Sequence, residues 1–105
     1  MNDEKVRRNA VVNHSLGIHL RPANLIVGLA KKYQSKVEVI RDNQRVDGKS
    51  ILDLLTLAAT QGCEVQIEAT GPDAEQAVAA LAELIASDFE DNDLPDTEPD
   101  TKLTP

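Results

Sequence analysis

The residues in this chain best placed to do chemistry are a histidine and an arginine in the run Gly-Ile-His-Leu-Arg-Pro-Ala at positions 17–23. From Pro22 to about Tyr33 apolar residues recur at helical spacing, which predicts a helix that begins near His19. The first N–H groups of a helix have no intrahelical acceptor and lie at the positive end of its dipole, so they form a site for anions. Arg21 adds a planar fork of donors that suits phosphate oxygens. The run therefore predicts a phosphate site that carries its own nucleophile.

The nucleophile of this site would be the imidazole of His19. Positive surroundings disfavour imidazolium, so the ring is expected to be neutral and nucleophilic near pH 7. A histidine that only caps the helix is the alternative interpretation, because short motifs of this kind also occur by chance.

A second run supports the chemical interpretation. Residues 48–57 read Gly-Lys-Ser-Ile-Leu-Asp-Leu-Leu-Thr-Leu, with Ser50 and Asp53 three apart ahead of an apolar stretch. This is a capping-box pattern, so Ser50 is expected to start a second helix.

Together the two runs resemble the HPr family of phosphocarrier proteins, which combines a Gly-apolar-His-x-Arg-Pro-Ala site with a Lys-Ser-apolar-apolar helix start ending here at Thr60-Gln61-Gly62. The resemblance covers residues 5 to 87. It implies that His19 accepts a phosphoryl group, as a pros-phosphohistidine, from phosphorylated enzyme I, and that Arg21 stabilises the phosphate. The group comes originally from phosphoenolpyruvate and passes on to a histidine of an enzyme IIA domain. Such a protein is a monomeric, stoichiometric carrier rather than an enzyme, and it needs no cofactor.

The resemblance implies two further roles. Ser50 caps its helix, and in one branch of the family the equivalent serine is also phosphorylated by a dedicated HPr kinase/phosphorylase, which changes binding to a transcription regulator. An apolar docking surface for partner proteins is expected beside the histidine, although each of its members could equally be ordinary core. The expected members of that surface are Leu20, Ala23, Ile51, Leu52 and Leu55, whereas Leu54 and Leu57 are assigned to the core. Leu20 and Asp53 depart from the commonest family pattern, which leaves the identity of the partners open.

Three rival functions differ in class. The chain could be a regulatory carrier of the nitrogen branch, which residues 68–72 and 88–91 resemble. It could be a pure interaction module that binds a transcription regulator when Ser50 is phosphorylated, but the retained His19 and Arg21 argue against that. A histidine-dependent hydrolase is the weakest, because the motif offers no second acid or base.

The elements that must position these residues follow from periodicity. Period-two alternation predicts strands at 6–13, with Ala10 and Val12 inward, and at 36–41, 44–47 and 64–69. The turn at 42–43 joins the middle pair, and Gly71-Pro72 opens a last helix that buries Ala74, Ala77, Val78, Leu81 and Ile85. The order βαββαβα with alternating strands predicts an α+β fold, an antiparallel sheet with three helices on one face. The family resemblance implies the open-faced sandwich with strand order 1-4-2-3.

Composition and charge divide the chain into a domain at 1–87 and a tail at 88–105. The 105 residues include 41% hydrophobic but only 2% aromatic residues, so the core is expected to be aliphatic. The net charge is −7, and seven acidic residues against Lys102 put −6 of it in the tail. The tail is expected to be disordered, acting for solubility or, alternatively, as a docking segment. A nearly neutral domain with an acidic tail argues against nucleic acid as a partner.

Cysteine, histidine and hydropathy patterns exclude further classes. Cys63 is the single cysteine, so an internal disulfide or a cysteine metal cluster is excluded, and a packed thiol is favoured over a reactive one. His14 and His19 have no third ligand close in sequence, so no metal site is expected and His14 is assigned to a loop. Without a bilayer-length apolar run or a signal-peptide pattern, the protein is expected to be cytoplasmic and not inserted in a membrane.

Overall fold

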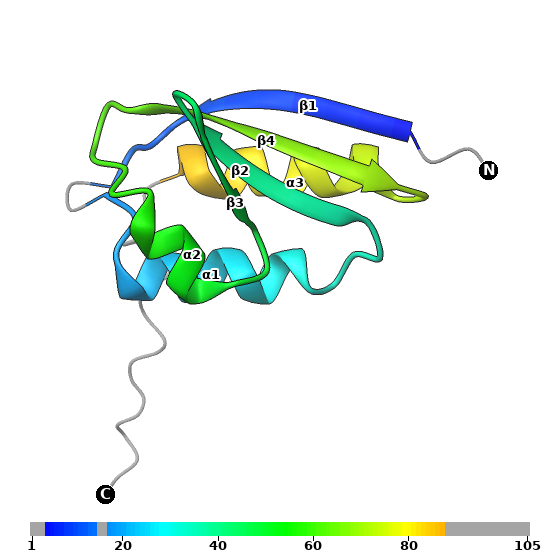
Figure 1. Cartoon of the computed structure of the whole chain (residues 1–105), viewed down its shortest axis with the longest axis horizontal. Coiled ribbons are helices and arrows are strands. Elements are labelled where there is room, and N and C mark those ends of the chain that lie inside the picture. The colour runs from blue at the N-terminus through cyan, green and yellow to red at the C-terminus, as the bar shows by residue number, and fades with distance from the viewer. Residues whose placement is uncertain (1–3, 15–16, 88–105) are drawn as a thin grey trace, which may run out of the picture.

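The structure, a computed structural model, describes residues 4–14 and 17–87. Within these ranges the elements follow the predicted order (Figure 1). They are β1 (Glu4–Val11), α1 (Leu20–Ala30), β2 (Lys36–Arg41), β3 (Gln44–Asp47), α2 (Ile51–Thr56), β4 (Glu64–Gly71) and α3 (Ala74–Ala86). No helix in the described ranges is long and apolar enough to cross a membrane. The predicted tail at 88–105 lies outside the described residues, so both interpretations of it stay predictions.

The four strands form one antiparallel sheet in the order β1-β4-β2-β3, as predicted. Ile67 of β4 lies opposite Arg8 of β1 and Val39 of β2, and Val39 in turn lies opposite Val46 of β3. The three helices cover one face of this sheet and leave the other open (Figure 1). The predicted open-faced α+β sandwich is confirmed.

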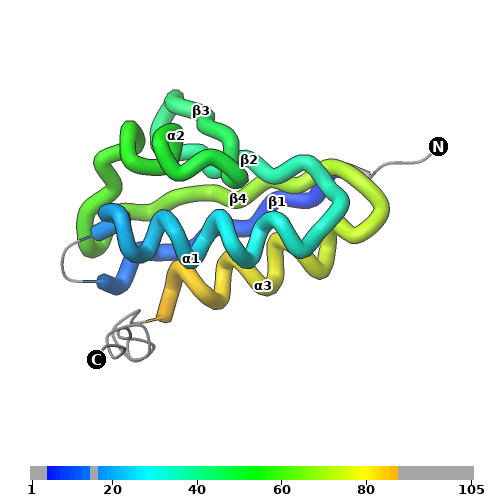
Figure 2. The backbone as a smooth tube through the Cα atoms, turned by 90° about the horizontal axis from the view of Figure 1, so that it is seen from below, coloured from blue at the N-terminus to red at the C-terminus, as the bar shows by residue number. Residues whose placement is uncertain are grey.

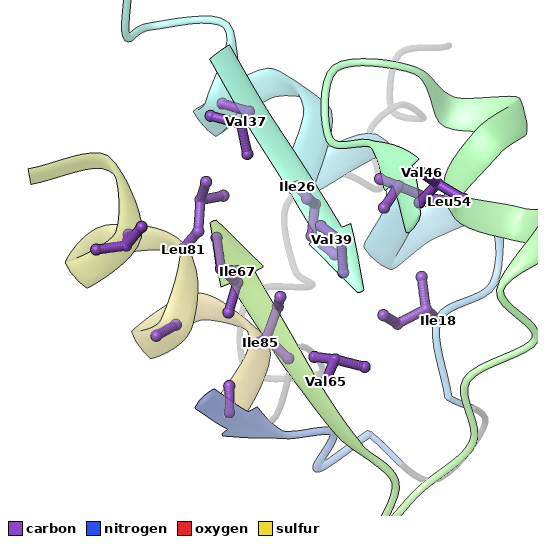
Figure 3. Close-up of a cluster of buried hydrophobic side chains, with 14 of the residues drawn as sticks. Ile18, Ile26, Val37, Val39, Val46, Leu54, Val65, Ile67, Leu81 and Ile85 are labelled. Carbon is purple, nitrogen blue, oxygen red and sulfur yellow. The ribbon is translucent and has the colours of Figure 1, made fainter. Parts of the chain in front are cut away.

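The core between sheet and helices is aliphatic, as the near absence of aromatic residues predicts. Figure 3 shows the side chains of the sheet, α1, α2 and α3 meeting in this layer. Ala10 and Val12 point into it, Leu54 and Leu57 are fully buried, and so is the predicted face of α3. The largest fully buried side chains are Ile26, Leu54, Leu57, Ile67, Leu81, Ile85, Val12, Val37, Val39, Val65 and Val78.

Two helices end earlier than predicted. Helix α1 stops at Ala30 rather than near Tyr33, because the N–H groups of Lys32 and Tyr33 bond three residues back, to the carbonyls of Leu29 (3.0 Å) and Ala30 (3.1 Å). Such bonds tighten the last turn and end the regular helix. Helix α2 ends at Thr56 rather than at 60–62, since Ala58 takes a left-handed conformation with φ +52°.

The open face of the sheet carries an ion cluster centred on Glu68, which the sequence analysis did not predict. The Glu68 carboxylate lies 3.2 Å from Lys5, 3.0 Å from Arg7 and 2.9 Å from Arg45. Arg45 also contacts Glu38 at 2.7 Å. Burial raises the pKa of Glu68, but the hydrogen bonds from Arg45, Lys5 and Arg7 outweigh it and lower the pKa to about 2. Because Glu38 lies on β2, the cluster links all four strands of the sheet.

Candidate phosphoryl-acceptor site

The loop that leads into α1 depends on Gly17. Its φ of +74° lies in the left-handed region that glycine adopts without strain. A Cβ at this position would also collide with the backbone oxygen of Ala59 and lie 2.8 Å from the Cα of Thr60. The next N–H group, of Ile18, donates to the Ala59 carbonyl at 2.9 Å. The loop is therefore held against residues 59–60, which sets the direction in which α1 begins.

His19 is the N-cap residue of α1, but its side chain makes no capping hydrogen bond. Its backbone is extended (φ −111°, ψ −163°), and its carbonyl accepts the helical bond from the N–H of Ala23 at 2.9 Å. The alternative in which the imidazole is used as a helix cap is therefore contradicted. The ring remains available for other chemistry.

The His19 ring is half-buried, and its two nitrogens are not equivalent. The Nε2 atom is shielded from solvent and has no hydrogen-bond partner among the described residues. Removal from water lowers the pKa of His19, and the nearby charges of His14 and Arg21 lower the pKa further. The neutral, nucleophilic form is thus favoured, as the sequence predicts, although desolvation rather than positive charge is the largest cause.

Arg21 lies with His19 around one shallow depression. The depression has a volume of about 410 Å³ and is lined by His19, Leu20, Arg21, Asn24 and Leu25. Arg21 is half-buried, whereas Leu20 is 63% exposed at the rim. A histidine and a guanidinium that share an open depression at a helix N-terminus can hold an anion within reach of a visiting protein.

Sequence analysis missed the position of His14. It lies in the loop, as predicted, but it is buried, and its ring centroid is 5.1 Å from that of His19 with the planes tilted by 55°. The sequence signal that could have indicated this pairing is the spacing of the two histidines, which lie five residues apart across a strand-to-helix bend. Within the described ranges no three His, Cys, Asp or Glu side chains are arranged to hold a metal ion.

Ser50 is the N-cap of α2 and accepts a 3.2 Å hydrogen bond from the N–H of Asp53. This half of the predicted capping box is present. The other half differs, since the Asp53 carboxylate accepts from the N–H of Asp47 at 3.2 Å. Lys49 donates to the carbonyl of Tyr33 at 2.9 Å.

The predicted docking residues fall into two groups. Leu20 and Leu52 are exposed (63% and 75%), and Ile51 and Leu55 are half-buried. The prediction for Ala23 is wrong, because its side chain is fully buried. Helical spacing places Ala23 on the same face as Ile26, Val27 and Ala30, which are all in the core. Leu20 lines the His19 depression, and α2, which carries the other three residues, packs against α1.

Comparisons with known proteins agree with this geometry. Residues 6–87 match the family described as the PTS HPr component phosphorylation site. The phosphocarrier protein HPr of Treponema pallidum is 38% identical over 86 residues, covering 82% of this chain and 97% of the relative. HPr of Borreliella burgdorferi is 40% identical over 82 residues, covering 78% of this chain and 95% of the relative.

Solved structures give the same result. The crystal structure of HPr-C-His from Thermoanaerobacter tengcongensis superimposes with a TM-score of 0.77 at 38% identity, over 81% of this chain and 96% of that one. The crystal structure of HPr from Bacillus anthracis superimposes with a TM-score of 0.74 at 32% identity, over 77% of this chain and 96% of that one. The open-faced sandwich of this chain is thus shared with solved phosphocarrier structures, among them a histidine-containing phosphocarrier protein from Mycoplasma. This chain belongs to the HPr family, the phosphocarrier proteins of the phosphotransferase system.

Proposed function

We propose that this chain carries a phosphoryl group on His19, which it accepts from phosphorylated enzyme I and passes to a histidine of an enzyme IIA domain. The observation that carries the proposal is the uncapped imidazole of His19, which shares an open depression with Arg21 at the N-terminus of α1. Phosphoryl transfer needs positioning and charge balance around the equatorial oxygens, and little covalent work from the protein.

The acceptor atom is Nδ1, the pros nitrogen, because Nε2 is shielded from solvent and an incoming phosphorus atom must approach through solvent. The Nδ1 lone pair attacks phosphorus while the donor's bond to phosphorus breaks and its electron pair returns to the donor. Arg21 binds the phosphoryl oxygens. The lowered pKa of His19 keeps the lone pair free of a proton over most of the neutral range.

The partner proteins dock on an apolar surface made by Leu20, Ile51, Leu52 and Leu55. Leu20 lines the depression itself, and the other three lie on α2, which packs against α1. Leu20 and Leu52 are exposed, and exposed apolar side chains are typical of a protein interface. Enzyme I and enzyme IIA use the surface in turn, since donor and acceptor both have to reach the same atom.

Reconstitution tests the proposal. Purified chain is incubated with phosphoenolpyruvate and enzyme I, and acid-labile phosphate on the chain is measured. We expect His19→Ala to accept none, Arg21→Glu to accept slowly and Arg21→Lys to be intermediate, because lysine keeps the charge but loses the planar fork. Full phosphorylation of His19→Ala would reject the proposal.

A regulatory role for Ser50 is the second candidate. Its hydroxyl already lies at the N-terminus of α2, where a phosphate would meet the same N–H donors. A dianion next to Ile51 and Leu52 would also change the charge of the docking surface. The partner would then be a transcription regulator, and the protein would serve regulation rather than sugar uptake.

Two measurements separate these roles. Incubation with an HPr kinase and ATP, followed by mass mapping, should place acid-stable phosphate on Ser50 and none on a Ser50→Ala control. An unmodified Ser50 would remove the regulatory proposal. Comparing the rates with the enzyme I of the sugar branch and that of the nitrogen branch identifies which system the carrier serves.

A further inference from the structure

His14 is a second imidazole that the proposed transfer does not use, although it lies directly beside the acceptor. The residue is only 5% exposed, so neither a partner protein nor a phosphoryl group reaches it from solvent. Its ring centroid is 5.1 Å from that of His19, and the two ring planes are tilted by 55°. Aromatic rings at this separation are in direct contact. The ring of His14 therefore forms part of the buried surroundings of the acceptor ring.

The backbone on both sides of His14 is fixed by hydrogen bonds. Val12 donates to the carbonyl of Cys63 at 2.9 Å and accepts from the N–H of Gly62 at 2.8 Å. The carbonyl of His14 itself accepts from the N–H of Gly17 at 2.9 Å. Figure 2 shows the end of β1, the start of α1 and the segment between α2 and β4 together at one end of the molecule. These bonds place the His14 ring without any contribution from the acceptor.

The His19 ring, in contrast, has few fixed contacts of its own. It makes no capping hydrogen bond, and its Nε2 atom has no hydrogen-bond partner among the described residues. The outer torsion of a histidine side chain is broad and roughly two-fold, so packing has to select one orientation of the ring. His14 supplies an aromatic surface for that packing. A ring that turned over would carry Nδ1 away from the depression that His19 lines.

We propose that His14 is a positioning residue for phosphoryl transfer, whose buried ring packs on the His19 ring and holds it with Nε2 inward and Nδ1 toward the depression. The proposal rests on the proposed function and deepens it. Holding a nucleophile in line before the donor arrives lowers the barrier, and a misplacement of about 1 Å can cost about 100-fold in rate. His14 neither accepts the phosphoryl group nor touches the donor, so it acts only through His19.

The same contact helps to keep the acceptor free of a proton. The pKa of His19 is lowered first by its removal from water and then by the charges of the neighbouring imidazole and of Arg21. Other nearby groups add no competing charge. Residues 59–62, which hold the loop, are uncharged, and at the start of α2 the side chains of Lys49 and Asp53 bond to backbone groups. Loss of the His14 ring admits water and removes one positive neighbour, so it raises the pKa of His19.

Single-turnover transfer from phosphorylated enzyme I to the full chain tests the positioning. We expect His14→Ala to lower the saturating rate at pH 7 about tenfold, because the ring loses its support. The half-saturating carrier concentration should stay within about twofold, because a buried residue makes no contact with the docked partner. His14→Phe, which keeps an aromatic ring, should recover the rate to within about threefold of wild type.

The matched control is Val12→Ala, which removes buried apolar volume two residues earlier and should keep the wild-type rate. Circular dichroism shows which variants are folded. A folded His14→Ala variant that transfers at the wild-type rate would overturn the proposal. A folded His14→Phe variant that is as slow as His14→Ala would also overturn it, since the ring contact would then not be what matters.

NMR on the histidine side chains tests the contact in the unaltered chain and does not depend on any variant folding. We expect nuclear Overhauser effects between the ring protons of His14 and His19. The pKa of His19 should be higher in His14→Ala than in wild type and unchanged in Val12→Ala. Absence of the ring-to-ring effect in wild type, or an unchanged His19 pKa in His14→Ala, would overturn the proposal. A wild-type chain that accepts no phosphate would instead reject the proposed function, and the NMR result would still decide whether His14 holds His19.

Discussion

Replacing Glu68 by glutamine removes the negative charge on which the open face of the sheet converges. The pKa of Glu68 is lowered from an ordinary value of 4.5 to about 2, which at about 1.4 kcal/mol per unit corresponds to at most about 3.5 kcal/mol of stability. The side chains of Lys5, Arg7 and Arg45 are 66%, 49% and 44% exposed, so solvent screens part of this energy. We expect Glu68→Gln to lower the free energy of unfolding by about 1–2 kcal/mol at pH 7.

The stabilising contribution of Glu68 depends on pH in a direction set by its lowered pKa. A carboxylate with a lowered pKa in the folded state stabilises the fold fully above about pH 4.5, and this contribution is lost as the pH falls to about 2. This contribution is measured as a difference in the free energy of unfolding, from urea unfolding monitored by far-ultraviolet circular dichroism at pH 7, 4 and 2. The difference between wild type and Glu68→Gln should shrink through this window and vanish near pH 2. Glu64→Gln, at an exposed position of the same strand, is the control. A difference that is absent at pH 7, or unchanged at pH 2, would refute the reasoning.

The remaining predictions concern the loops and surfaces around the site. Gly17→Ala should destabilise the fold by about 2 kcal/mol or more in urea unfolding, because the new Cβ meets both a left-handed backbone and the Ala59 carbonyl; a change below 0.5 kcal/mol would contradict the loop geometry. Ala58→Gly should raise the free energy of unfolding by about 1 kcal/mol, and with it the thermal midpoint, since glycine takes the left-handed position after α2 without strain. A lower midpoint would count against this account. Leu52→Asp should leave stability within about 0.5 kcal/mol, as its side chain is 75% exposed, but should raise the KM of enzyme I for the carrier; an unchanged KM would remove Leu52 from the docking surface.

Local patterns predicted the elements best where the chain signals both the element and its end. Strands β2 and β3 have the predicted bounds, because the alternation is regular and Asp42-Asn43 marks the turn. The predicted end of α2, at 60–62, was wrong because the sequence carries no clear signal where the helix ends, at Thr56. Apolar residues continue through Leu57, and the left-handed residue that ends the helix is Ala58 rather than the glycine or asparagine that usually marks such a position.

The site was predictable in part. The positions of His19, Arg21 and Ser50 at two helix starts follow from motif and spacing. The helical period places Ala23 on the buried face of α1 with Ile26 and Ala30, whereas the family resemblance predicts an exposed docking residue. The Glu68 cluster was not readable, because Glu68 meets Arg7 and Arg45 through strand register, and these partners are 61 and 23 residues away in the sequence. The burial of His14 beside His19 likewise depends on how the loop folds back.

Under the proposed function, the openness of the His19 depression also limits how long the phosphorylated carrier lasts. The ring is half-buried, and Leu20 at the rim is 63% exposed, so no lid among the described residues closes over the position of the phosphoryl group. Because this position is open to solvent, we expect spontaneous hydrolysis of a phosphohistidine at His19 to compete with transfer to a partner. The proposed phosphorylated form is therefore expected to be a short-lived intermediate rather than a store of phosphoryl groups, with a level set by the balance between supply from the donor and loss by transfer and hydrolysis.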